Sequence, residues 1–305
     1  MLTIIRKAAP RFVVPGHQPG NADWQALHRI ADSHYPAMVQ EFLTAVEAMQ
    51  NGINQAELVQ LLAQGPDAVW LKMAQAWEAG GRQVIEAAWA ERFVPLVQAA
   101  AQASQASVLA LVPPSLHVTL NVVFGQVNTA AVEIARTLAG QRITLITPAT
   151  LDGVRTVLTR AFTEGRTPDQ VARTLARTVG LRPDQVNQLL NYENALAATP
   201  KATAAKQQQL VRRFARRLLR QRGEVIMRTE TINTASAGQQ LLWERAEAQG
   251  FLAATLRRFW VITPDDRLCP YCRQIPKLNA EGRGIREPFQ MPGGGTVMHP
   301  GAHPS

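Results

Sequence analysis

Four residues near the end of the sequence have the side chains and the spacing of a metal site. Cys269 and Cys272 form a C-x-x-C pair, and His299 and His303 follow close to the last residue. A C-x-x-C turn brings two thiolates to one metal ion, and two histidines complete a tetrahedral Cys₂His₂ zinc set. These four residues are therefore predicted to bind a structural zinc ion.

The same residues have other interpretations, which the sequence leaves open. The two cysteines could form a disulfide or remain thiols, and histidines beside prolines are often loop residues. No βαβ pattern precedes Cys269, so a thioredoxin-like redox pair is not favoured. Two cysteines in a chain of 305 residues indicate a reducing compartment.

A tryptophan, an aspartate turn and the cysteine pair occur in a fixed order, and the sequence then closes on H-P-G-A-H-P-S. The residues concerned are Trp260, Asp266, Cys269, Cys272 and residues 299–305. This pattern resembles the C-terminal segment of the phage minor head protein, or head morphogenesis, family, as in phage Mu. The family ends in P-P-x-H-P-x-C-R-C. This chain ends at Ser305 where the family has C-R-C, and His299 stands where the family has proline. If the polypeptide is truncated there, the family's metal set would use the missing cysteines and His303.

The resemblance extends upstream through the phrase Arg228-Thr229-Glu230, which precedes a run of small residues at 235–238. It is most specific over residues 226–305 and more diffuse from residue 150. Arg228 and Glu230 do not face each other on a helix, because they are two positions apart. Each is expected to take part in a structural ion pair that links this helix to the C-terminal segment. A catalytic role for Glu230 is the alternative.

The resemblance implies a structural protein of a tailed-phage virion. Such a protein acts near the portal vertex in head assembly or in genome packaging and delivery. The expected partners are the portal protein, the major capsid protein and packaged double-stranded DNA, with several copies per virion. The expected location is the capsid interior or portal vertex, and the host cytoplasm during assembly.

Charge is distributed unevenly along the chain, whose net charge is +9. Residues 151–305 hold 23 Lys and Arg against 13 Asp and Glu, whereas residues 1–150 hold nine against ten. A basic half beside a nearly neutral half predicts contact with a polyanion, of which nucleic acid is the commonest.

The most basic stretch begins at Lys201 and contains no acidic residue before Glu224. On a helix its arginines gather on one face, opposite an apolar stripe of Leu210, Phe214 and Leu218. Guanidinium groups in this arrangement bind phosphates well. A solvated face, or a face that pairs with an acidic protein, is the alternative. The predicted DNA-phosphate contacts are Arg212, Arg213, Arg216, Arg217, Arg220 and Arg222.

Helical periodicity and turn signals predict a mainly α fold. The expected architecture is a helical N-terminal region, followed by an α+β C-terminal domain with a small Cys/His metal-knuckle end. The predicted parts are an extended arm (1–20), a helical domain that forms an assembly surface (21–141), a helical part of a head-morphogenesis-like domain (142–259) that contains the basic helix 201–222, and a strand plus Cys/His knuckle (260–305).

Several functional classes are not favoured by the sequence. The uncharged run 93–132 contains Pro113 and Pro114 and many polar residues, so no membrane span is expected. No nucleophile–base set, phosphate-binding glycine loop or dinucleotide fingerprint is present, so no catalytic residue and no enzyme activity are predicted. The alternative functions are a zinc-knuckle regulator that binds nucleic acid and a metal-dependent nuclease.

Overall fold

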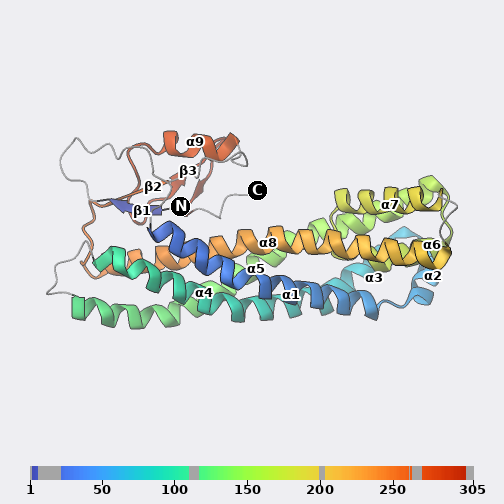
Figure 1. The fold of residues 1–305 in the computed structure, drawn as a ribbon, viewed down its shortest axis with the longest axis horizontal. Coiled ribbons are helices and arrows are strands. Elements are labelled where there is room, and N and C mark those ends of the chain that lie inside the picture. Colours follow the sequence, from blue (N-terminus) through green and yellow to red (C-terminus); the bar gives the residue numbers. More distant parts are fainter. Residues whose placement is uncertain are drawn as a thin grey trace. The chain divides into compact units, whose positions relative to one another are not determined.

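The computed structural model describes residues 2–5, 22–109, 117–198, 203–260, 262 and 270–299. Within these residues the chain is mainly helical, which confirms the mainly α part of the predicted fold class (Figure 1). The α+β C-terminal domain with its metal knuckle stays a prediction. The helices are α1 (Ala22–Gly52), α2 (Gln55–Gln64), α3 (Pro66–Ala76), the π-helix η1 (Trp77–Arg82), α4 (Gln83–Leu109), α5 (His117–Glu164), α6 (Pro168–Thr178), α7 (Pro183–Ala197), α8 (Ala204–Ala248) and α9 (Pro270–Leu278). The strands are β1 (Leu2–Ile5), β2 (Arg257–Trp260), β3 (Phe289–Gln290) and β4 (Thr296–Val297).

Local sequence signals account for several helix ends. The Asn54 side chain accepts hydrogen bonds from the first N–H groups of α2, as an N-cap does. Thr167 and Gln170 form a capping box at the start of α6, in which each side chain accepts a hydrogen bond from the other residue's backbone N–H. Gly180, with φ 84°, follows α6 in the left-handed conformation that glycine adopts most easily.

The chain forms two compact units that are built from interleaved segments. Unit 1 comprises residues 1–35, 90–138 and 228–305, and unit 2 comprises residues 36–89 and 139–227. Helices α1, α4, α5 and α8 each contribute one part to each unit. The units therefore do not follow the linear succession of domains that the sequence predicts.

The predicted boundary after residue 141 lies inside α5, which runs without interruption from His117 to Glu164. Several residues after position 141 are β-branched, which lowers helix propensity, but tertiary packing overrides such weak propensities. The Thr147 hydroxyl accepts a hydrogen bond of 2.8 Å from Trp77 Nε1, and Thr150 is buried. Packing within unit 2 therefore holds this part of the chain in helical form.

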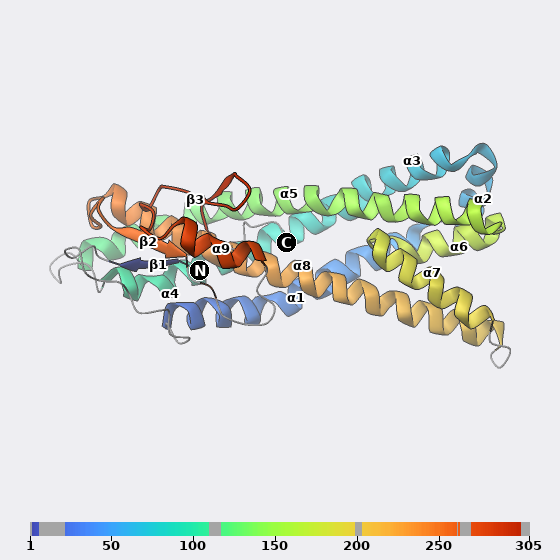
Figure 2. The same cartoon turned by 90° about the horizontal axis from the view of Figure 1, so that it is seen from above.

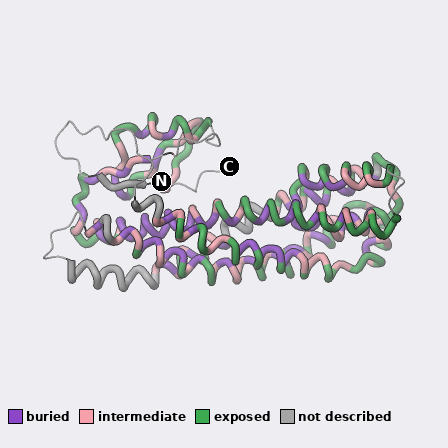
Figure 3. Tube along the Cα trace, in the orientation of Figure 1, coloured by how far each residue is buried: buried purple, intermediate pink, exposed green. Residues whose placement is uncertain are grey.

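Unit 1 is organised around the second half of α8, whose residues 230–243 are almost all buried (Figure 3). Its apolar core includes Trp243 from α8 and Val97 from α4, together with Trp260 and Phe289 from the strands. β2 pairs antiparallel with β1, and β3 pairs antiparallel with β4. The strand that the sequence places at the start of residues 260–305 is observed slightly earlier, at 257–260.

In unit 2, α7 lies antiparallel to the first half of α8 (Figures 1 and 2). The rings of Tyr192 and Phe214 stack with centroids 4.5 Å apart. The amide of Gln185 donates to the Leu218 carbonyl at 3.0 Å. Because these contacts come from one face of α8, the opposite face is left toward solvent.

Two further sequence predictions concern the extended arm at residues 1–20 and the expectation of no membrane span. The predicted extended arm contains β1, and residues 6–20 lie outside the described part of the chain. In the part that the structure describes, none of the helices has the length and apolarity of a membrane span.

Candidate nucleic-acid interface and C-terminal segment

The first half of α8 presents an exposed row of arginines. Its buried side consists of small and apolar residues, of which Val211, Leu218 and Leu219 are each at most 3% exposed. Leu210 and Phe214, which the sequence placed in the apolar stripe, are only partly buried. We name the exposed set the arginine face of α8, and its members are Arg212, Arg213, Arg216, Arg217 and Arg220.

Arg222, which the sequence grouped with these arginines, belongs to the interior of unit 2. It is 5% exposed, and its Nη1 donates to the Gly180 carbonyl and, at 3.1 Å, to the Thr150 hydroxyl. Burial lowers its pKa to about 10. Position 222 follows Leu218 by four residues and so lies on the buried side of the helix. Its prediction as a phosphate contact is therefore corrected: Arg222 links α8 to α5 and to the end of α6.

The members of the arginine face differ in what they already contact. Both Nε and Nη2 of Arg216 lie 2.9 Å from one carboxylate oxygen of Glu47, although the Arg216 side chain is 72% exposed. The Arg217 guanidinium stands 4.7 Å from the centroid of the Phe214 ring, in a cation–π arrangement. This contact orients the Arg217 side chain without neutralising its charge, because the Phe214 ring carries no net charge.

Positive charge extends from α8 onto α6. Burial lowers the pKa of Arg177 on α6, and the positive charges of Arg212 and Arg173 lower it further, while Glu193 opposes the shift. Arg173 and Arg212 are therefore close enough to Arg177 for their positive charges to repel its charge. A polyanion near this region would relieve their repulsion, which favours binding of phosphate groups.

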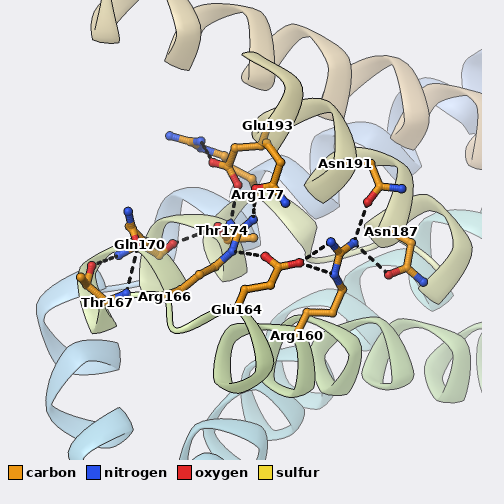
Figure 4. A network of polar contacts seen from close by, with 11 residues as sticks. Arg160, Glu164, Arg166, Thr167, Gln170, Thr174, Arg177, Asn187, Asn191 and Glu193 are labelled. Atoms are coloured by element: carbon orange, nitrogen blue, oxygen red, sulfur yellow. Dashed lines mark hydrogen bonds and ion pairs between the residues drawn. The ribbon is translucent and has the colours of Figure 1, made fainter. Parts of the chain in front are cut away.

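A polar network fixes the helices next to this basic region (Figure 4). Arg160 on α5 pairs with Glu164 and donates to Asn191 on α7 at 3.0 Å. Arg166 donates to Glu164 at 2.8 Å and to Glu193 on α7 at 2.7 Å. Both arginines are paired with carboxylates, and these ion pairs connect α5, α7 and the turn before α6.

Arg228 and Glu230 occupy different environments on α8. Arg228 is exposed, whereas Glu230 is 5% exposed. This agrees with their spacing of two residues, which directs them to different sides of a helix. Their predicted ionic link to the C-terminal segment stays a prediction. Among the described residues, Arg286 forms an ion pair with Glu247 of α8 at 2.9 Å.

Arg258 on β2 bonds to several parts of the chain that follows it. The sequence pattern does not predict this role. Arg258 is fully buried, and its guanidinium donates to the carbonyls of Gly284 at 3.0 Å and Met298 at 2.8 Å, and to that of Glu287. Its Nη1 also donates to the Gln240 side chain of α8. Burial lowers its pKa to about 10 despite nearby carboxylates. Nothing in the local sequence distinguishes Arg258 from its partly buried neighbour Arg257.

The four predicted metal ligands are only partly within the described residues. Cys272 on α9 is partly buried against the core of unit 1, and partly buried His299 directly follows the Met298 carbonyl that Arg258 binds. Cys269 and His303 lie outside the described part of the chain. Within that part, no group of three or more His, Cys, Asp or Glu side chains is arranged to hold a metal ion. The zinc site stays a prediction.

Comparison with protein-family models, with curated proteins and with solved structures found no match to this chain.

Proposed function

We propose that this chain is a structural minor capsid or head morphogenesis protein of a tailed phage, which contacts packaged DNA through its backbone phosphates. The arginine face of α8 is the observation that carries the DNA contact. The motif resemblance over residues 226–305 supports the phage-head assignment. The proposed role is non-catalytic, and it places the protein inside the capsid or at the portal vertex.

The arginine face suits phosphates better than base edges. Arginine forms paired hydrogen bonds with phosphate oxygens and keeps its charge at any physiological pH. Five exposed arginines lie within nine residues, from Arg212 to Arg220, and no acidic residue lies between them. Sequence-specific recognition would require side chains that reach into a groove. We therefore propose binding that tolerates any DNA sequence.

The test is the salt dependence of binding to a short labelled DNA duplex, measured by fluorescence anisotropy between about 50 and 200 mM salt. Each phosphate contact adds about 0.9 to the slope of log K against log salt. The double variant Arg213→Gln, Arg220→Gln should reduce that slope by about two. Arg245→Gln, an exposed arginine near the other end of α8, is the matched control and should leave the slope unchanged.

Glu47→Gln provides a test in the opposite direction. Glu47 holds Arg216 and adds negative charge beside the arginine face, so its neutralisation should tighten DNA binding by about two- to fivefold. Equal binding by the wild type and by both variants would assign the arginine face to another role. A strong preference for one DNA sequence would favour the regulator, and metal-dependent cleavage of the duplex would favour the nuclease.

Assembly with head proteins is the second part of the proposal. We propose the portal protein and the major capsid protein as partners, with several copies of this chain in each virion. Co-sedimentation of the purified chain with assembled portal rings or capsid shells tests this directly. A chain that stays in the supernatant at every concentration would contradict it.

We also propose that Cys269, Cys272, His299 and His303 hold a structural zinc ion. When bound, zinc would crosslink the two ends of the C-terminal segment and add to its folding free energy. The described surroundings of Cys272 and His299 fit this role, because both side chains belong to unit 1 and both are partly shielded from solvent.

A further inference from the structure

One edge of β2 is closed by the first residues of the chain. The antiparallel register with β1 sets Thr3 opposite Phe259 and Ile4 opposite Arg258. The other edge is already occupied, because the N–H and C=O groups of Arg258 both bond to Arg283, at 2.6 and 2.9 Å. β2 therefore lies between two partners, and β1 closes the side that would otherwise be open.

The register shows which backbone groups β1 satisfies. In a strand, the N–H and C=O groups of one residue point to the same side, and those of the next residue point to the opposite side. Because Arg258 bonds to Arg283, the backbone groups of Arg257 and Phe259 point toward β1. Thr3 and Ile5 are their hydrogen-bonded partners, whereas the N–H of Ile4 points away from β2.

This edge is adjacent to the core of unit 1. Leu256 and Trp260, which flank the pairing groups, are 4% and 7% exposed. An unpaired strand edge beside apolar side chains is a template for pairing with another extended segment. An extended segment can therefore pair with this edge whenever β1 leaves it.

The strand that fills the edge is joined to the rest of the chain by a long connection. Residues 6–21 separate β1 from α1. A segment of this length can span up to about 50 Å. The described contact of β1 with β2 is a backbone pairing, which any copy of the chain can supply in the same register.

We propose that the edge of β2 is an acceptor site for an extended strand, and that Leu2–Ile5 of a second copy of this chain fills it when copies are concentrated. In dilute solution the tether gives the chain's own strand an effective concentration of about millimolar, so self-pairing prevails. Where many copies are held together, exchange preserves every hydrogen bond and connects neighbouring copies. This inference does not depend on DNA binding.

Interchain crosslinking tests the exchange directly. Thr3→Cys is made in one full-length chain and Phe259→Cys in another of different tagged size. The two positions form a hydrogen-bonded pair, whose Cα separation of about 5.5 Å suits a disulfide. Mixing at high concentration and then oxidising should give a disulfide-linked heterodimer that needs both substitutions. Each variant mixed with wild-type chain controls for the native cysteines, and absence of the heterodimer above these controls would overturn the proposal.

A matched pair of proline variants tests the same edge without cysteines. Thr3→Pro removes an N–H that bonds to β2, whereas Ile4→Pro removes one that points away. Because exchange replaces each intrachain pairing by the same interchain pairing, neither variant should change the dimer association constant. Thr3→Pro weakens the pairing that must open first, so it should speed the exchange of β1 between labelled copies by about fivefold or more, and Ile4→Pro should leave this rate near the wild-type value, as measured by fluorescence energy transfer. Circular dichroism checks that both variants fold. Equal exchange rates in all three chains, or no exchange in any of them, would contradict the proposal.

Discussion

At the residue scale, Arg258 combines full burial with bonds to three backbone carbonyls. The planar guanidinium reaches carbonyls that are far apart in the sequence, and it also lies 5.0 Å from the centroid of the Phe289 ring. A lysine at this position would retain a charge but would lack the fork of donors. Arg258 therefore orders the segment that carries His299.

Arg258→Lys is expected to lower the free energy of unfolding of unit 1 by about 3 kcal/mol, because several buried carbonyls would lose their donor. Denaturant unfolding followed by tryptophan fluorescence measures the change. Arg257→Lys is the control, since Arg257 is only partly buried and its described ion pair with Glu287 is long, at 3.7 Å. Similar losses for both variants would contradict the role given to Arg258.

The histidines of α1 predict how stability depends on pH. Burial lowers the pKa of His28, and also that of His34, below the ordinary value of 6.5. The unfolded chain therefore binds more protons than the folded chain when the pH falls through about 6.5. The free energy of unfolding should fall as pH decreases from 7 to about 5, since the folded state disfavours the charged form. The midpoint of thermal unfolding across this range measures it.

His28→Gln should weaken this pH dependence, because one of the two histidines that must remain neutral is removed. The electrostatic surroundings of His28 include Asp32, which raises its pKa, and Arg228, which lowers it. A steeper decline of stability at low pH in the variant would contradict the assignment.

At the scale of elements, the approach of α8 to α4 depends on a glycine. A Cβ atom at Gly238 would lie 2.4 Å from the Val97 carbonyl oxygen, so the two helices would have to separate. The close approach of α4 contributes to the burial of the polar stretch around Gly238. The packing of unit 1 therefore depends on a small residue at this contact.

Gly238→Ala is expected to destabilise unit 1 by about 1–3 kcal/mol through overpacking, although alanine is the better helix former. Gly52→Ala at the end of α1 is the matched control, because nothing lies within 4 Å of its added Cβ. Chemical denaturation of the two variants measures the difference. Unchanged stability of Gly238→Ala would show that the helices separate without loss.

At the scale of the whole molecule, the C-terminal segment is the part for which a metal is predicted. Cys269→Ser should abolish zinc binding and increase proteolysis of the last ~50 residues, because a structural metal contributes folding free energy. Elemental analysis should find about one zinc per chain in the wild type and in the control His34→Gln. Wild-type protein without zinc would contradict the predicted ligand set.

The sequence by itself determined the helical class, the caps of α2 and α6, and the exposed arginines of α8. These features follow from local rules, since a capping box or a helical face depends on residues a few positions apart. Thr167 with Gln170 and the spacing of Arg213 and Arg220 are examples. Such signals are present in the chain before any tertiary contact forms.

Tertiary structure alone decided the division into units and which of the arginines are buried. The continuity of α5 through residues 142–150 depends on packing within unit 2. Arg222 and Arg258 can be buried because their guanidinium groups donate hydrogen bonds to the carbonyls of Gly180 and Gly284, which are distant in sequence. The pairing of Leu2–Ile5 with β2 likewise joins the two ends of the chain. A linear pattern does not contain these pairings, since each depends on which distant segment supplies the partner.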